Sequence, residues 1–264
     1  MKKRIITGLI MLLVAIPVVY LGGYVFTTAV LLMALMSYKE MLDLKKNYGK
    51  IPNLMKILGA ISMLFILYND KGFGISYTSI TYQRLIAALL LTVLPVLFYK
   101  DNKYTAKQAF YLFGVAFFLG LGFNLFINAR NASLPIFVFL VSIAIFNDIF
   151  ALLGGRLLGR HKLMPTVSPK KTIEGSIVGG IFGMIIPLLV YHFYCGRPID
   201  FRAIICTLVL CAASQIGDLV FSKFKRECEV KDFSNIFPGH GGMLDRLDSL
   251  FFVVMTFMLL IFNL

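Results

Sequence analysis

Charged residues are scarce in this sequence, and long polar stretches are missing. Only 15% of the residues are charged, whereas 59% are hydrophobic. Such a chain could not bury its apolar surface within one water-soluble globule, so the composition excludes an ordinary soluble fold. We therefore expect an all-α polytopic membrane protein in which no separate soluble domain fits between the spans.

Cysteine-based sites and nucleotide-binding loops of the common kind are missing as well. The four cysteines show neither a Cys-x-x-Cys pair nor a cysteine and histidine spacing typical of zinc, which argues against a zinc site or a disulfide framework. The Gly-x-x-x-x-Gly-Lys-Ser/Thr pattern of a Walker loop is also absent. Any chemistry must therefore depend on acids, bases and glycine turns.

The apolar segments predict about nine membrane-spanning helices. Residues 5–38 are too long for a single crossing, at about 51 Å if they were one helix. The Gly22-Gly23 pair divides them into two spans joined by a tight turn. The other seven spans are predicted at residues 54–68, 85–99, 109–127, 134–153, 176–195, 203–221 and 249–264.

The basic residues predict how these spans are oriented. Lysine and arginine gather in cytoplasmic loops, and most of the 26 basic residues fall on one side if the amino terminus lies inside. With nine spans the carboxyl terminus then lies outside. The net charge of +13 follows from this topology and from anionic lipid headgroups, so no nucleic-acid partner is expected. We expect one membrane-embedded domain over residues 1–264, with helices that lack a chemical motif in residues 1–130 and a catalytic half in residues 131–264.

One acid stands inside a predicted span of the second half. Asp148 follows Asn147 in an otherwise apolar segment. A carboxylate at that depth costs about 2.5 to 3.5 kcal/mol, so it must face a polar cavity, a partner or a cation. The alternative is an acid near the cytoplasmic end of the span that only hydrogen-bonds a neighbour.

The loop before the seventh span has the features of an anion site. Ser168 before Pro169 has the form of a helix N-cap followed by proline at the first helical position, which leaves free amide hydrogens beside Lys170 and Lys171. Phosphate is the usual occupant of such a helix start. An ordinary surface cap with solvated lysines is the alternative.

Acids and bases are densest between residues 218 and 248. On a helix, Asp218 shares one face with Ser222, Lys225 and Arg226. Asp245 and Asp248 share a face at the start of the last helix, so three carboxylates meet if the two helix ends converge. Hard oxygen ligands in this number favour Mg²⁺. The glycine-rich turn at residues 238–242 would let the backbone approach a ligand, although its His240 taken alone could be an ordinary loop histidine.

These residues carry a family resemblance. The pattern that carries it is Ser222-x-Phe224-Lys225-Arg226-x4-Lys231-Asp232-x-Ser234-x2-Phe237-Pro238-x-His240-Gly241-Gly242-Met243-x-Asp245-Arg246-Leu247-Asp248. It resembles the signature of the phosphatidate cytidylyltransferases, also called CDP-diglyceride synthases. The segment from Ser168 to Gly175, preceded by Asp148 and Gly155-Arg156, is similar to a second motif of that family. The chain departs from the family pattern at four positions, which are Ile149, Phe150, Leu152 and Ile173.

The resemblance implies a membrane-embedded, dimeric enzyme that makes CDP-diacylglycerol and pyrophosphate from CTP and phosphatidate with Mg²⁺, with a second cation as an open alternative. The metal ligands that it implies, together with the reading of the acids above, are Asp218, Asp245, Asp248, Asp148 and Glu174. The residues expected to bind phosphates of CTP or phosphatidate are Ser168, Lys170, Lys171, Thr172, Ser222, Lys225, Arg226, Lys231, Gly241 and Gly242. The residues expected to take part in catalysis are Lys171, Lys225, Arg226, His240 and Arg246.

Two other functions stay open at this point. A CTP-dependent polyprenol or dolichol kinase would share the helical bundle and the nucleotide but would transfer the γ-phosphoryl group. A lipid or ion transporter would place its acids along a path through the membrane. The candidate residues cluster at one membrane face, which argues against a transporter. The length and compactness of the chain are typical of bacterial proteins, so we expect a bacterial cytoplasmic membrane, with an organellar membrane as the alternative, and an active site on the cytoplasmic side.

Overall fold

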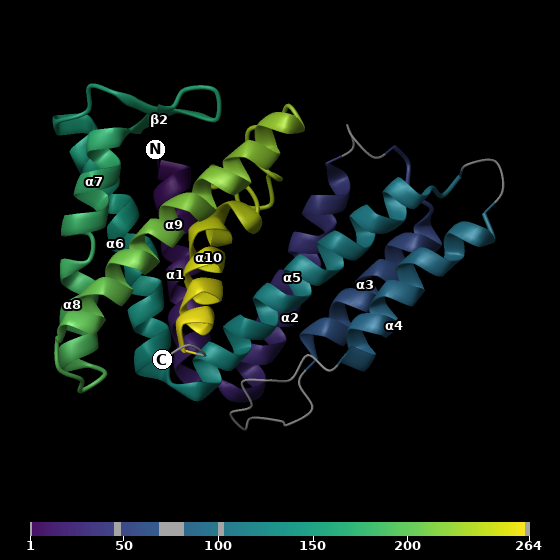
Figure 1. Cartoon of the computed structure of the whole chain (residues 1–264), viewed down its shortest axis with the longest axis horizontal. Helices are drawn as coiled ribbons and strands as arrows, with labels where there is room; N and C mark the ends of the chain where they lie inside the picture. Colours follow the sequence, from purple (N-terminus) through teal and green to yellow (C-terminus); the bar gives the residue numbers. More distant parts are fainter. Residues whose placement is uncertain (1, 45–48, 69–81, 100–102, 262–264) are drawn as a thin grey trace. The chain divides into compact units, whose positions relative to one another are not determined.

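The computed structural model describes residues 2–44, 49–68, 82–99 and 103–261. This part of the chain is mostly helical, as predicted, with one two-stranded sheet (Figure 1). Contacts between Cα atoms divide the chain into an amino-terminal unit, Met1–Ala132 with Asp232–Leu244, and a carboxyl-terminal unit, Ser133–Lys231 with Asp245–Leu264. The last three residues of the predicted ninth span, and Lys45, Lys46, Lys71 and Lys100 of the charge pattern, lie outside the described residues.

The amino-terminal unit confirms the predicted break at Gly22-Gly23, which separates the first two helices. Gly22 and Gly23 have φ angles of 63° and 52°, a left-handed conformation that favours glycine. The guanidinium of Arg130 donates to the carbonyl oxygens of Val19 and Tyr20 and so satisfies acceptors left free at the end of the first helix. The elements of this unit are α1 (Lys2–Leu21), α2 (Gly23–Asp43), α3 (Asn53–Leu67), α4 (Tyr82–Val93), the 3₁₀ turn η1 (Leu94–Leu97) and α5 (Ala106–Ala132).

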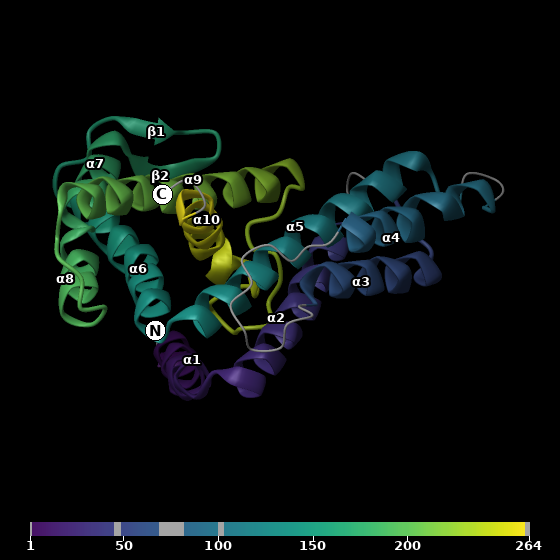
Figure 2. The same ribbon diagram turned by 60° about the horizontal axis from the view of Figure 1, so that its bottom comes forward.

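The core of the amino-terminal unit forms around α5, which contacts α2, α3 and α4. Leu112, Ala116, Leu119 and Phe123 of α5 are fully buried there. Figures 1 and 2 both show α3 and α4 running alongside α5. The helices that sequence reasoning left without a chemical motif therefore form a packed bundle.

The carboxyl-terminal unit is organised around α6 (Leu134–Leu157), which contacts α7 (Ile173–Phe182), α8 (Ile185–Phe193) and α9 (Phe201–Glu227). Glycines allow the closest of these crossings. A Cβ atom at Gly175 would stand 2.6 Å from the carbonyl oxygen of Ala151, and one at Gly179 would stand 2.7 Å from the Ala151 Cβ. The elements of this unit are α6 (Leu134–Leu157), β1 (Lys162–Met164), β2 (Ser168–Thr172), α7 (Ile173–Phe182), α8 (Ile185–Phe193), α9 (Phe201–Glu227) and α10 (Leu244–Ile261).

The seventh predicted span is interrupted, which the sequence reading did not anticipate. Helix α7 ends at Phe182, and α8 begins at Ile185. Proline has no N–H, so Pro187 cannot donate to the carbonyl oxygen of Gly183 four residues earlier. The missing bond falls at the junction of the two helices.

The expected helix start at Ser168 is wrong. Ser168 lies in strand β2 and pairs with Met164, so Pro169 belongs to a β-hairpin and not to a first helical turn. The N-cap of α7 is Thr172, whose hydroxyl accepts a hydrogen bond from the amide of Gly175 at 3.1 Å. The hairpin forms in place of the expected helix start because its two strands satisfy each other's backbone N–H and C=O groups. The local sequence around Ser168 does not reveal this pairing.

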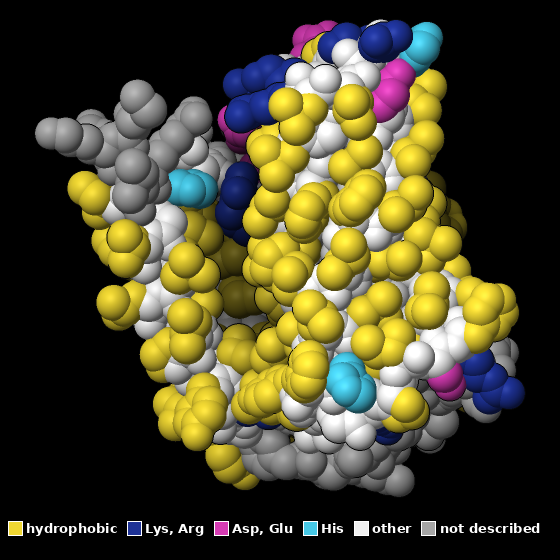
Figure 3. Space-filling model, turned by 90° about the vertical axis from the view of Figure 1, so that its left-hand side faces the viewer, with side chains coloured by type: hydrophobic (Ala, Val, Ile, Leu, Met, Phe, Trp, Pro, Cys, Tyr) yellow, Lys and Arg dark blue, Asp and Glu magenta, His cyan; other side chains and the backbone are white. Residues whose placement is uncertain are grey.

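Five stretches of the described chain are long and apolar enough to cross a membrane, as expected of an integral membrane protein. They are Gly23–Asp43, Ala106–Ala132, Leu134–Leu157, Ile173–Phe193 and Phe201–Glu227. Figure 3 faces the side of the carboxyl-terminal unit that carries α7 and α8, where hydrophobic side chains cover the middle and charged side chains gather at the two ends. One of these ends carries the hairpin.

Candidate active site

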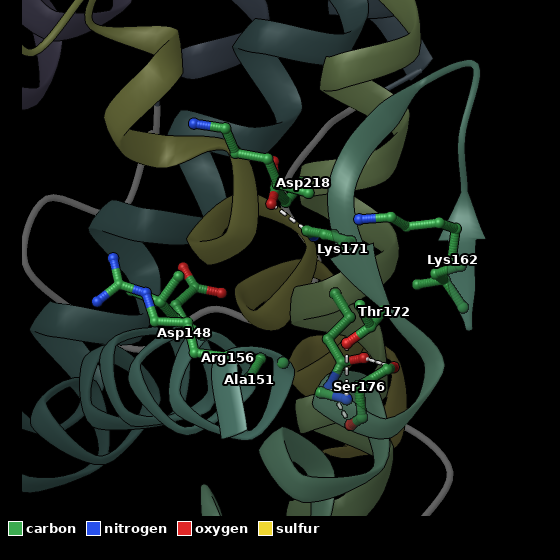
Figure 4. A pocket seen from close by; sticks show the side chains of 14 residues that line it. Asp148, Ala151, Arg156, Lys162, Lys171, Thr172, Ser176 and Asp218 are labelled. Carbon is green, nitrogen blue, oxygen red and sulfur yellow. Dashed lines mark hydrogen bonds and ion pairs between the residues drawn. The ribbon is translucent and has the colours of Figure 1, made fainter. Parts of the chain in front are cut away.

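A cavity of about 650 Å³ opens in the carboxyl-terminal unit between the hairpin, α6, α7 and α9. This volume is within the range of small-molecule sites, roughly 300 to 1,000 Å³. Its lining combines four basic side chains with two acids, as Figure 4 shows in part. The polar residues of the lining are Asp148, Arg156, Lys162, Lys170, Lys171, Thr172, Ser176, Gln215 and Asp218.

An ion pair crosses this cavity from the hairpin to α9. The Nζ atom of Lys171 lies 2.5 Å from Oδ2 of Asp218, and Figure 4 shows the two side chains pointing toward each other. The hydroxyl of Ser222 donates to Oδ1 of Asp218 at 3.2 Å, which agrees with the predicted position of both residues on one helix face. Both side chains of the ion pair are about one-quarter exposed, so an anion entering the cavity can reach the lysine.

Two further carboxylates lie within electrostatic range of Asp218. Asp248 interacts electrostatically with both Asp218 and Asp148, and Asp148 also with Lys171. Ser249 joins them, because its hydroxyl lies 3.4 Å from an oxygen of each of Asp148 and Asp248. The expected meeting of Asp218, Asp245 and Asp248 is not found as predicted, because Asp245 pairs with Lys225. Asp148 of α6 is the acid that interacts with Asp218 and Asp248.

These three carboxylates fit a magnesium ion in the type of donor that they offer. Carboxylate oxygens are the ligands that Mg²⁺ takes from proteins, with water and substrate phosphates completing its octahedron. In the described residues, however, no three side chains of histidine, cysteine, aspartate or glutamate lie close enough together to hold one ion. The type of donor therefore suits Mg²⁺, but the arrangement of the described residues does not form a protein cage for the ion.

Glu174 pairs with groups at the chain that leads into the hairpin. Its Oε1 atom is 2.6 Å from Nδ1 of His161, and its carboxylate accepts from the backbone amides of Arg160 and His161. Glu174 thereby ties the start of α7 to the chain that leads into the hairpin. These contacts favour a role in holding the hairpin in place.

Asp245 forms a buried ion pair with Lys225. The Lys225 Nζ atom lies 2.6 Å from Asp245 Oδ1, and the two side chains are 10% and 3% exposed. The adjacent Arg226 donates to the backbone carbonyl oxygens of Val167 and Val230. These contacts show that the basic residues at the end of α9 hold the hairpin turn and the start of α10.

The glycine-rich turn belongs to the amino-terminal unit. The amide of Phe237 donates to the carbonyl oxygen of Gly241, and Gly241 donates back to Phe237. Gly239 and Gly241 have φ angles of 80° and 83°, which only glycine adopts readily. Nδ1 of His240 is buried and has no hydrogen-bond partner among the described residues, which distinguishes it from an ordinary solvated loop histidine.

The other predicted residues have varied surroundings. Lys170 is exposed and lines the cavity, and Thr172 is buried beneath it as the helix cap. Ser168 is half-buried in β2, whereas Lys231 and Arg246 are exposed. Of the lysines expected to bind phosphates, only Lys170 and Lys171 line this cavity within the described residues.

Sequence reasoning missed several polar residues, among them Lys162 of the cavity lining. Gln215 and Ser176 line the cavity and bond to each other, and Gln215 also donates to Asn147 at 2.9 Å. Glu40 is 1% exposed in the last turn of α2, beyond the predicted end of the second span. An acid that follows a long apolar run is the local signal that could have drawn attention to it.

Comparisons with known proteins point in the same direction as the site. The sequence model of the cytidylyltransferase family matches residues 2–264. A phosphatidate cytidylyltransferase of Staphylococcus haemolyticus is 35% identical over 254 residues, which is 96% of each chain. Proteins of the same name from Staphylococcus epidermidis and Staphylococcus aureus are 35% and 34% identical, each again over 96% of both chains.

Proposed function

Because the chain belongs to the cytidylyltransferase family, we propose that it transfers the cytidylyl group of CTP to phosphatidate and releases pyrophosphate. The observation that carries this proposal is the cavity in which Lys171 pairs with Asp218 among other basic side chains. Cations and carboxylates in one cleft suit a reaction between two phosphate esters. The relatives named phosphatidate cytidylyltransferase support the choice of substrates.

The reaction needs positioning and charge neutralisation more than proton transfer. An oxygen of the phosphatidate phosphate attacks the α-phosphorus of CTP in line, the bond from that phosphorus to the bridging oxygen breaks, and pyrophosphate leaves. A phosphate monoester is already largely ionised near neutral pH, so no strong general base is required. Lys170, Lys171, Lys162 and Arg156 line the cavity and would bind and orient the phosphates.

Magnesium would be held by Asp218 and Asp248, with Asp148 added. When bound there, the ion neutralises charge on the transferring phosphate. Asp245 and Glu174 remain candidate ligands, although each already holds other protein groups, Lys225 for Asp245 and His161 for Glu174. A second cation and a homodimer also remain predictions.

The predicted topology gives each face of the bilayer a separate set of loops. We propose nine spans with the amino terminus inside, which puts the hairpin and its cavity on the cytoplasmic side of a bacterial cytoplasmic membrane. Soluble CTP and membrane-bound phosphatidate could meet there. The positive-inside distribution of lysine and arginine supports this arrangement.

Two native cysteines test the topology. Cys228 follows α9 and Cys195 follows α8, so they should label from opposite sides of sealed vesicles. With Cys206 and Cys211 replaced by alanine, an impermeant maleimide should react with Cys195 from outside the cell and with Cys228 only after permeabilisation. Labelling of both cysteines from the same side would contradict the nine-span arrangement.

Labelled CTP tests the reaction itself. Purified protein in detergent is given phosphatidate, Mg²⁺ and CTP labelled at either the α or the γ phosphorus. Label from the α position should appear in lipid, and this should stop when EDTA removes Mg²⁺ or when Asp218 is replaced by asparagine. Label from the γ position in lipid would indicate a kinase, and no label in lipid from either position would favour a transporter.

A further inference from the structure

A buried carboxylate of the amino-terminal unit binds the family's signature segment directly. Glu40 accepts hydrogen bonds from the hydroxyl of Ser234 at 2.6 Å and from the amides of Met243 and Leu244 at 2.7 Å and 2.9 Å. The partners lie about 200 residues away in the chain, yet they belong to the same compact unit as α2. One side chain therefore closes both ends of the segment from Ser234 to Leu244.

The bond to Leu244 falls at the beginning of a helix. Leu244 is the first residue of α10, and the first amides of a helix have no acceptor within the helix. A carboxylate at this end also interacts favourably with the helix dipole. Glu40 thus acts as a cap supplied by another helix, and bonds to an ionised acceptor are about twice as strong as neutral ones.

Gly242 provides a second, independent sign that the chain is shaped around Glu40. Unlike Gly239 and Gly241, it does not have a positive φ angle, so its backbone conformation is open to other residues. A Cβ atom at this position would instead stand 2.5 Å from Oε1 of Glu40 and 2.8 Å from Oγ of Ser234. Glycine is required there because the carboxylate lies so close.

We propose that Glu40 is a positioning residue of the active site, which holds the segment from Ser234 to Leu244 and the first turn of α10 in the conformation that catalysis requires. The inference rests on the proposed function, because that function gives catalytic or metal-binding roles to His240, Arg246 and Asp248, which lie within or next to the segment that Glu40 holds. His240 lies within the held segment, and Arg246 and Asp248 lie in the first turns of α10. Glu40 touches no reacting atom and acts only through these neighbours.

Glu40→Gln is the sharpest test, because it keeps the size of the side chain while turning one accepting oxygen into a donor that faces other donors. In the full-length protein in detergent, kcat should fall by about 100-fold, as expected of a small displacement in a catalytic constellation. KM for CTP should change little, since no contact to substrate is removed. Asp43→Asn is the matched control, because Asp43 is exposed three residues later on the same helix and should keep the wild-type kcat.

Two further variants separate positioning from general stability. Gly242→Ala should reproduce the kcat defect, and Ser234→Ala should add little in the Glu40→Gln background because both changes disturb one set of bonds. The rates are expressed per folded molecule, with the folded fraction taken from thermal unfolding in the same detergent. A wild-type kcat per folded molecule in Glu40→Gln would overturn the proposal and leave Glu40 a purely structural residue.

Hydrogen exchange tests the same contacts without any assay of activity. The amides of Met243 and Leu244 should exchange faster in Glu40→Gln than in the wild type or in Asp43→Asn. Unchanged exchange would overturn the role of Glu40, whatever reaction the protein performs. If the wild type forms no CDP-diacylglycerol, the proposed function is overturned, and the positioning role falls with it. Faster exchange in Glu40→Gln would still show that the bonds of Glu40 to Met243 and Leu244 exist.

Discussion

Lys171→Ala is expected to lower kcat/KM for CTP by about 100- to 1,000-fold, the size of loss seen when one preorganised charge-stabilising group is removed. Two effects act in the same direction. The cavity loses a cation placed to bind phosphate, and Asp218 loses the partner that lies 2.5 Å away. The freed carboxylate would then repel the phosphates of an incoming nucleotide.

The measurement is the initial rate of CDP-diacylglycerol formation with CTP varied at fixed phosphatidate in mixed micelles. Lys223→Ala is the matched control, because Lys223 is an exposed lysine that also pairs with an acid, Glu227, at 3.5 Å. Such surface pairs contribute about 0.3 to 0.5 kcal/mol, and Lys223 lies outside the cavity lining, so its loss should leave the rate close to that of the wild type. Equal rates for the two variants would contradict the role given to Lys171.

Lys225→Ala is expected to destabilise the protein by about 3 to 5 kcal/mol, the range for breaking a buried ion pair from one side. Asp245 is 3% exposed, so removing the lysine leaves a negative charge where water cannot solvate it well. Asp245→Ala should destabilise the protein by a comparable amount, because it leaves the positive charge of Lys225 buried without its partner. Thermal unfolding in a single detergent measures both.

The double variant Lys225→Met with Asp245→Leu distinguishes folding from chemistry. Replacing both charges with apolar side chains of similar size should restore most of the stability, because neither partner is then left buried alone. A stable but inactive double variant would support Asp245 and Lys225 as parts of the site. A stable and active one would show that the pair serves the fold alone, and failure to recover stability would contradict the ion-pair explanation.

Local periodicity was sufficient to predict most of the helices and some of the site. The break at Gly22-Gly23 and the shared helix face of Asp218 and Ser222 both depend on neighbours within about four residues, and both are confirmed. The spacing of Lys225 also placed it on the Asp218 face. Its ammonium group forms an ion pair with Asp245 instead, because a buried charge is stabilised only when an opposite charge lies beside it.

The features that could not be predicted depend on contacts between distant residues. Ser168-Pro169 has the local form of a helix start, but pairing with β1 makes it a strand and moves the cap to Thr172. Glu40 has no partner nearby in sequence that would reveal its role. Glu40 reaches the amides of Met243 and Leu244 only when the chain has folded.

The division of the chain bears on how such an enzyme could be taken apart or fused to other proteins. Neither compact unit is a continuous piece of the gene, because the segment Asp232–Leu244 leaves the carboxyl-terminal unit to join the amino-terminal one before the chain returns. A fragment that began at Ser133 would encode the cavity and its ion pair but would lack α2 and its Glu40 carboxylate. No single cut therefore yields two modules that each keep all of their own residues.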